Sequence, residues 1–116
     1  RIVTGAFDGP RDEYWFRKHL PGDGSVAFAD TSKSMVTIGV WGPNAREVLS
    51  SITDDDLSNE GFPYGTTAEV DFGGIRARLL RISYVGELGW EIYVPVDQAR
   101  HAFDALVERA DEQEDL

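Results

Sequence analysis

The stretch TTAEVDFGGIRARLLRISY, residues 66–84, decides the fold. Apolar and polar side chains alternate over residues 68–72, which is the pattern of a half-buried strand. The pair Gly73-Gly74 then gives a hairpin turn signal, and residues 75–84 continue as a second, longer strand. The stretch therefore predicts an antiparallel hairpin.

Further strands are predicted on both sides of this hairpin. Residues 26–29 and 35–41 are β-rich apolar runs, and residues 1–6 begin inside another such run. A last strand at residues 90–94 is closed by Pro95, which cannot donate a ladder hydrogen bond. These runs indicate a sheet of several short strands.

Three helices are predicted between the strands. Asp12 stands where an N-cap belongs, ahead of apolar residues at helical spacing that stop at Pro21-Gly22. Pro43 suits the first position of a second helix. Asp97 can cap a third helix, in which an apolar stripe runs over residues 99–110.

The element order β-α-β-β-α-β-β-β-α predicts an α+β fold. We expect a mixed, mostly antiparallel sheet with helices on one face, including ferredoxin-like split βαβ elements. The 116 residues, 41% of them hydrophobic, suffice for one core. Because residues 1–6 start inside a strand pattern without an initiator Met, we expect residues 1–116 to be a single fragment whose flanking parts are missing. The side chains predicted to be largely buried are Trp41, Phe72, Leu79, Ile82 and Phe103.

Composition excludes several classes of function. Asp and Glu number 21 against 11 Lys and Arg, and the resulting charge of −10 repels nucleic-acid backbones. No apolar run approaches the roughly 20 residues that cross a bilayer or the length of a signal-peptide core, which favours a cytoplasmic protein without a membrane partner. The chain has no cysteine and only two, widely separated histidines, which excludes a zinc site. The acidic run at residues 54–56 lacks the carboxylate spacing and the later glutamate of a calcium loop, so no metal site is predicted.

The acidic excess is spread along the chain, and only Lys18 and Lys33 are lysines among the basic residues that otherwise are arginines. Two explanations stay open. One is a halophilic source, because a strongly anionic surface keeps proteins soluble in high salt. The other is an ordinary solvated acidic surface encoded by a GC-rich genome.

The densest candidate for chemistry is SYVGELGWE, residues 83–91. Gly86 and Gly89 let the backbone turn around a single acidic residue, Glu87, and present its carboxylate at a strand end. Two carboxylate oxygens match two parallel N–H donors on a flat ligand, and Tyr84 can stack on or cap that ligand. The alternative is a glycine-bearing hairpin whose glutamate is simply solvated.

Two motifs in this order carry a family resemblance: WGPNA at residues 41–45 and RISYVGELGWE at residues 81–91. Over nearly its whole length the chain resembles the folate-binding region of the glycine-cleavage T-protein (aminomethyltransferase) family. It is more similar to the T-protein-like part of dimethylglycine and sarcosine dehydrogenases and oxidases. Thr4, which stands where T-proteins typically carry an asparagine, favours this branch.

The resemblance implies a tetrahydrofolate site. In it, Glu87 grips the N3–H and 2-amino group of the pterin, and Tyr84 lies near the ring. The family's acidic residue near folate N5 and N10, and its arginine for the folate tail, fall outside residues 1–116. The resemblance therefore implies no catalytic residue in this chain, and we expect the fragment alone to be inactive.

The resemblance also implies the partners. In the flavin-bearing branch a small amine is oxidised at FAD and its carbon is captured by folate, whereas in the T-protein branch the carbon arrives on an aminomethyl donor. We expect part of the folate-binding region of an FAD-linked dimethylglycine or sarcosine dehydrogenase or oxidase. The alternatives are a stand-alone glycine-cleavage aminomethyltransferase and a non-catalytic T-protein-like regulatory module.

Overall fold

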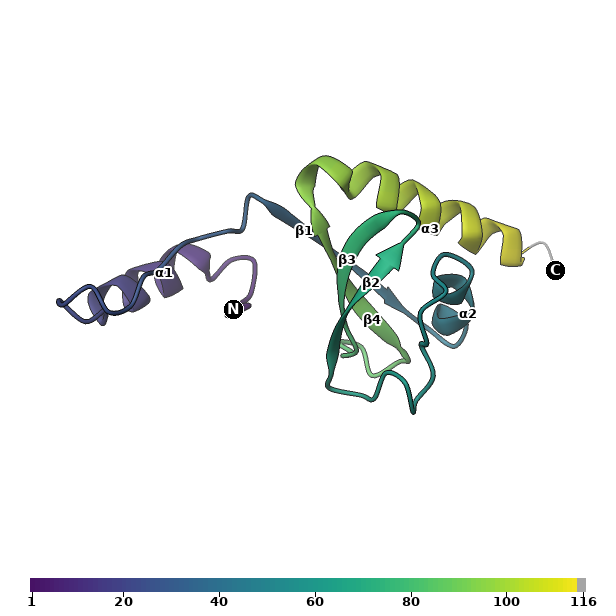
Figure 1. Ribbon diagram of the computed structural model, residues 1–116, viewed down its shortest axis with the longest axis horizontal. Helices are drawn as coiled ribbons and strands as arrows, with labels where there is room; N and C mark the ends of the chain where they lie inside the picture. The colour runs from purple at the N-terminus through teal and green to yellow at the C-terminus, as the bar shows by residue number, and fades with distance from the viewer. Residues whose placement is uncertain (115–116) are drawn as a thin grey trace. The chain divides into compact units, whose positions relative to one another are not determined.

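A computed structural model describes residues 1–114 of the chain, and the side chains of residues 1–113. The chain forms two compact units, Arg1–Ser32 and Lys33–Leu116, which are described separately. In chain order the elements are α1 (Gly9–Lys18), β1 (Met35–Trp41), α2 (Ala45–Ser50), β2 (Thr67–Phe72), β3 (Ile75–Leu80), β4 (Gly89–Pro95), the 3-10 helix η1 (Val96–Gln98) and α3 (Ala99–Glu114) (Figure 1). No helix within residues 1–114 is long and apolar enough to cross a membrane.

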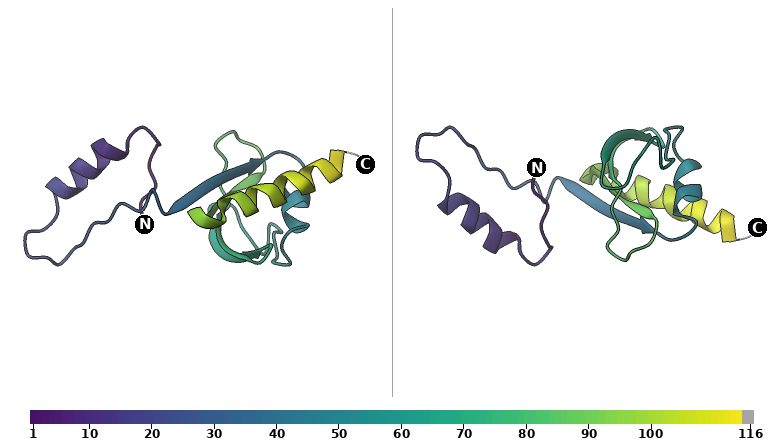
Figure 2. Two further views of the ribbon diagram at one scale, coloured as in Figure 1. Left: turned by 90° about the horizontal axis from the view of Figure 1, so that it is seen from above. Right: turned by 90° about the horizontal axis from the view of Figure 1, so that it is seen from below.

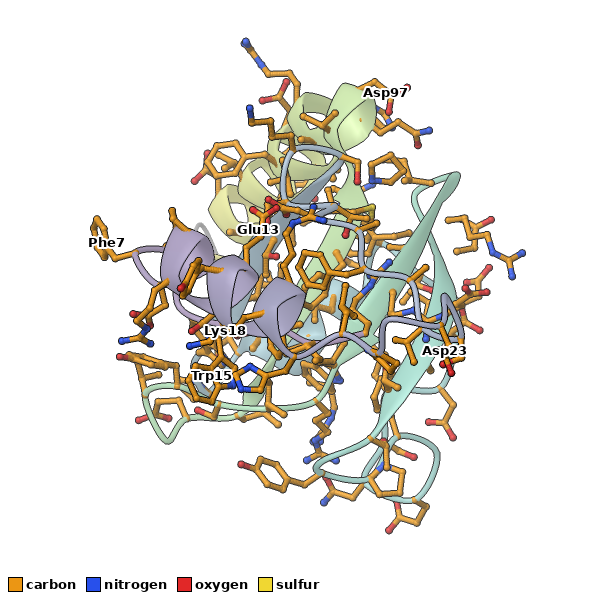
Figure 3. The ribbon with its side chains drawn as sticks, turned by 90° about the vertical axis from the view of Figure 1, so that its left-hand side faces the viewer. Phe7, Glu13, Trp15, Lys18, Asp23 and Asp97 are labelled. Carbon is orange, nitrogen blue, oxygen red and sulfur yellow. The ribbon has the colours of Figure 1, made fainter. Side chains whose placement is uncertain are left out.

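The first unit contains α1 and irregular chain. The helix begins at Gly9, before the predicted cap Asp12, because Pro10 fits the first turn, where its missing N–H has no partner to lose. Phe7, at the entry to the helix, is fully exposed and projects away from the ribbon (Figure 3). α1 itself contains no buried residue.

Two of the predicted strands do not form. Residues 1–6 and 26–29 are irregular and belong to no sheet. In the second segment, Phe28 stacks on Phe16 of α1 with ring centroids 5.6 Å apart, and the Arg17 guanidinium lies 5.0 Å from the Phe28 ring centroid. Phe28 therefore packs against α1, and the segment of residues 26–29 pairs with no other described strand.

The second unit is built on a four-stranded sheet with the order β1-β4-β3-β2. All three pairings are antiparallel, and β2 and β3 form the predicted hairpin around Gly73-Gly74. The α+β class and the antiparallel sheet are therefore confirmed. The split βαβ element differs in strand order: α2 connects β1 to β2, and these two strands lie at opposite edges of the sheet with β4 and β3 between them, whereas a split βαβ unit encloses a single strand.

One face of this sheet carries the core. Alternate residues of each strand point to it, and α2 and α3 cover it, with α2 beside the C-terminal half of α3 (Figures 1 and 2). Helices on one face were predicted, and so was the burial of Phe72 and Leu79. The core consists of Val48, Leu49, Leu57, Phe62, Val70, Phe72, Ile75, Ala77, Leu79, Trp90, Ile92, Val94, Ala102 and Leu106.

Other predicted core positions differ. Phe103 is 54% exposed, so its predicted burial is wrong, and Leu106 on the next turn of α3 is the residue that reaches the core. Trp41 and Ile82 are only partly buried. The strand predicted over residues 75–84 ends at Leu80, where the chain leaves the sheet as a loop.

Candidate functional site

The loop of residues 81–88 connects β3 to β4 and carries both residues singled out from the sequence, Tyr84 and Glu87 (Figure 1). We call it the β3–β4 loop. Gly86 has a φ of +82°, a left-handed conformation that side-chain-bearing residues rarely adopt. The turn predicted at this glycine is therefore present, whereas Gly89 has an ordinary φ and begins β4.

The structure leaves both candidate side chains exposed. Tyr84 is 90% exposed, and Glu87 is exposed in the same loop. The Glu87 carboxylate makes no hydrogen bond or ion pair with residues 1–114. A carboxylate with free oxygens at a chain turn can accept two parallel N–H donors, and an exposed phenol ring beside it can contact a flat molecule.

A buried hydroxyl lies at the start of the loop. Ser83 Oγ is shielded from solvent and has no hydrogen-bond partner within the described chain. A buried polar atom without a partner is uncommon, because the loss of its solvation is not offset. Ser83 is thus a second polar group of the loop, next to Tyr84, with unused hydrogen-bonding capacity.

The end of β1 is bonded to the loop at two points. The indole Nε1–H of Trp41 donates to Ile82 O at 2.9 Å, and the backbone N–H of Gly42 donates to Leu88 O at 2.8 Å. These contacts join the WGP motif to the Y-x-G-E-x-G motif, which lie about forty residues apart in the sequence. The two motifs noted in the sequence are therefore parts of one structural site.

A second set of bonds starts at Arg81, the first residue of the loop. Its guanidinium donates to Phe62 O and to Asn59 Oδ1, both at 2.7 Å. Arg46 of α2 donates to the same Asn59 oxygen at 2.8 Å. Both guanidiniums lie near the ring of Trp90, a fully buried residue, at 5.5 Å for Arg81 and 5.8 Å for Arg46.

The roles of Trp41 and Arg81 could not be predicted from the sequence. Trp41 was expected in the core, whereas it is half-buried and its indole is hydrogen-bonded to the loop. One signal was present: Gly39 precedes Trp41 by two residues, so both lie on the same side of the strand. For Arg81 no signal existed, because its acceptors come from a loop without a recognisable motif.

Comparison with known proteins identifies relatives over almost the whole chain. Residues 1–115 match the family model of the GCVT N-terminal domain. A 4-methylaminobutanoate oxidase (formaldehyde-forming) of Paenarthrobacter nicotinovorans is 36% identical over 92% of the chain. An aminomethyltransferase of Listeria monocytogenes serotype 4a is 34% identical over 91%, and the mitochondrial dimethylglycine dehydrogenase of Homo sapiens is 31% identical over 97%.

The chain spans 13% of the length of the oxidase, 28% of the aminomethyltransferase and 13% of the dehydrogenase. Among solved structures, a heterotetrameric sarcosine oxidase from Corynebacterium sp. U-96, in complex with pyrrole 2-carboxylate, has the same fold. Its TM-score is 0.69 at 23% identity, covering 78% of this chain and 45% of that one. The resemblance inferred from the two sequence motifs is confirmed.

Proposed function

We propose, because the chain belongs to the GCVT N-terminal domain family, that it forms part of the tetrahydrofolate-binding region of a one-carbon transfer enzyme. The parent enzyme is of the FAD-linked dimethylglycine or sarcosine dehydrogenase or oxidase type. The relatives named above include an oxidase and a dehydrogenase of methylated amines, which supports this branch.

The observation that carries the proposal is the state of Glu87. Its carboxylate is exposed at the Gly86 turn and has no partner within the described residues. A pterin offers an N3–H and a 2-amino group side by side, and a carboxylate can accept from both with charge-assisted hydrogen bonds. Tyr84, three residues earlier and almost fully exposed, is available to contact the ring.

The roles of this chain's residues are binding and orientation. Glu87 would hold the pterin edge, Tyr84 would limit the tilt of the ring, and the orphaned Ser83 hydroxyl would satisfy a polar group nearby. Tetrahydrofolate, when bound, supplies the nitrogens that accept the one-carbon unit. Because the acceptor is already bound and oriented, the capture of a small carbon unit becomes an effectively unimolecular step in place of a bimolecular one.

A stand-alone aminomethyltransferase is the second candidate, supported by the 34% identity to the Listeria enzyme. Both candidates use folate as the acceptor and differ in the donor. A flavin-linked enzyme takes the carbon from a small methylated amine, which it oxidises. An aminomethyltransferase takes the carbon as an aminomethyl group and needs no oxidant. Turnover of dimethylglycine or sarcosine with an electron acceptor by the intact protein distinguishes them.

Calorimetric titration of tetrahydrofolate, without oxygen, into the intact protein tests the proposal. We expect binding by the wild type and an affinity at least about tenfold lower for Glu87→Gln, since charge-assisted hydrogen bonds contribute roughly 1.5–3 kcal/mol each. Glu60→Gln, in the exposed loop after α2, is the matched control and should bind as the wild type does. Absence of wild-type binding would contradict a folate function and favour a non-catalytic module.

A further inference from the structure

The end of β1 fastens the β3–β4 loop at both of its ends. The indole of Trp41 bonds the carbonyl of Ile82, near the start of the loop, and the N–H of Gly42 bonds the carbonyl of Leu88, its last residue. The two donors belong to adjacent residues. The five residues between the two bonded carbonyls, which include Tyr84 and Glu87, therefore form a segment whose two ends are hydrogen-bonded to adjacent residues at the end of β1.

Two glycines make room for the indole. Trp41 is directly opposite Gly89 in the β1–β4 register, and Gly39 lies on the same side of β1. A Cβ on Gly39 would collide with Cη2 and Cζ3 of the indole. A Cβ on Gly89 would collide first with the backbone oxygen of Val40, and it would also lie 2.5 Å from the indole Cδ1. Only a residue without a side chain leaves the ring in this place.

Neither glycine is needed for backbone conformation. Six other glycines of the chain have positive φ values, but Gly39 and Gly89 do not. A strand glycine with ordinary backbone angles weakens a sheet, because it packs no side chain and loses more entropy on folding. Gly39, whose Cβ would meet the indole alone, indicates that the position of Trp41 has a purpose besides filling the core, since Trp41 is only partly buried. Gly89 is required in addition by the nearby backbone oxygen of Val40.

Arg81, the first residue of the loop, is held by backbone hydrogen bonds to Gly65 and Thr66 and by its guanidinium. After Ser83 the loop has little else to order it. Tyr84, Val85, Gly86 and Glu87 are all exposed, and only Leu88 packs against the core. A loop with so few buried contacts samples many conformations unless its ends are fixed. Any ligand that binds to side chains on such a loop has to order it first, which lowers the affinity.

Resting on the proposed folate function, we propose that Trp41 is a positioning residue. Through its indole N–H it holds the β3–β4 loop in the conformation in which Tyr84 and Glu87 meet the pterin. Because Gly39 and Gly89 have no side chains, they leave the space in which the indole N–H can reach Ile82 O. Trp41 contributes through the loop and needs no contact with the ligand.

The variant Trp41→Phe tests this role, because phenylalanine keeps an aromatic ring beside Gly39 and Gly89 but has no N–H to donate. Trp15→Phe, on an exposed position of α1, is the matched control. Hydrogen exchange of the ligand-free protein, followed by mass spectrometry, should show faster exchange in the peptide covering residues 81–88 for Trp41→Phe. The control should exchange as the wild type does. Unchanged exchange in Trp41→Phe would overturn the proposal.

Gly39→Ala provides a second, independent perturbation. Its backbone angles suit alanine, so the substitution acts through the indole that the new Cβ would displace. Alanine in place of a strand glycine is otherwise mildly stabilising. We expect the same loosening of residues 81–88 as in Trp41→Phe. This variant keeps the proposal testable even where Trp41→Phe does not fold.

Tetrahydrofolate affinity completes the test through a double-mutant cycle. Trp41→Phe should weaken binding by about threefold to tenfold, the effect of one neutral hydrogen bond. Glu87→Gln should then cost less affinity in the Trp41→Phe background than in the wild type, because both act through one loop. Strictly additive effects would overturn the proposal. If the wild type binds no tetrahydrofolate, the proposed function fails. If it binds and Trp41→Phe binds equally well, only the positioning role fails.

Discussion

Arg46 and Arg81 donate hydrogen bonds to one and the same atom, the Oδ1 of Asn59, at 2.8 and 2.7 Å. The first arginine lies in α2 and the second is the first residue of the β3–β4 loop, so the Asn59 side chain connects α2 to the start of the candidate site. Neither guanidinium has an acidic partner within residues 1–114, although the chain carries a charge of −10.

Asn59→Ala should lower the free energy of unfolding by about 1–3 kcal/mol, because two charged donors lose their common acceptor. Urea denaturation measures this. Asn44→Ala is the control: Asn44 is the N-cap residue of α2 but makes no side-chain cap hydrogen bond, so its loss should change stability by less than about 0.5 kcal/mol. Equal effects of the two variants would show that the shared acceptor is unimportant.

Leu106→Ala should destabilise far more than Phe103→Ala. Leu106 is 6% exposed within the core, and removing a buried leucine side chain costs about 2–5 kcal/mol. Phe103 is 54% exposed, so its truncation should cost less than about 1 kcal/mol. Denaturant titration of both variants checks the order. A larger loss for Phe103→Ala would mean that its exposed face is covered in the intact protein.

The Arg76 guanidinium, which hydrogen-bonds Glu69 and attracts its charge, holds the pKa of that carboxyl below its ordinary value of 4.5, and Arg78 adds to the effect. A lowered folded-state pKa stabilises the fold above the unfolded-state value and ceases to do so as pH falls through the folded-state value. Glu69→Gln should therefore lower the urea midpoint slightly at pH 7. The two proteins should converge at acidic pH.

This pH comparison uses Glu60→Gln as its control, since Glu60 is exposed and takes part in no ion pair among the described residues. Its urea midpoint should follow the wild type at every pH. A gap between Glu69→Gln and the wild type that persists unchanged at acidic pH would exclude the titration of Glu69 as the cause.

Glu87→Gln should change the product of a flavin-linked parent enzyme. Amine oxidation precedes folate capture, so it should continue, while the iminium that folate no longer captures is hydrolysed to formaldehyde. Parallel assays of formaldehyde and methylene-tetrahydrofolate measure the change, with Glu60→Gln as the control. An unchanged ratio of the two products would contradict the assignment of Glu87 to the folate site.

The halophile explanation of the acidic composition predicts a melting temperature that rises from low ionic strength to molar KCl, because screening relieves the repulsion among excess carboxylates. Sucrose at equal osmolarity distinguishes this effect from exclusion of solutes from the surface. Full stability at low ionic strength would leave the ordinary acidic surface as the explanation.

Local signals in the sequence predicted the elements with nearby partners. The Gly73-Gly74 hairpin and the turn at Gly86 are both present. A glycine turn with a positive φ depends only on the glycine and its immediate neighbours in the sequence, so it can be predicted locally. Residues 1–6 show the limit of such signals: an apolar run becomes a strand only if another strand pairs with it, and no local pattern reports that.

Contacts between distant residues escaped prediction. The apolar stripe of α3 spans residues 99–110 and is wide enough that either Phe103 or Leu106 could face the core. Which of the two is buried depends on where the helix packs on the sheet. For the candidate site, the loop and its exposed glutamate were visible in the motif. The bond from Trp41 to Ile82 was not, since it depends on the pairing of β1 with β4.

The order β1-β4-β3-β2 also determines when the sheet can be completed during synthesis. β1 is the first strand of the unit to leave the ribosome, yet among the described strands it pairs only with β4, and the register joins Met35 to Pro95. β2 and β3 can pair as soon as their hairpin is translated. β1 can pair only after β4 has been translated, because β4 is the strand beside it in the sheet. Until β4 has been translated, the nascent chain therefore carries an unpaired, chargeless strand, MVTIGVW, and exposed segments of this kind favour aggregation during folding.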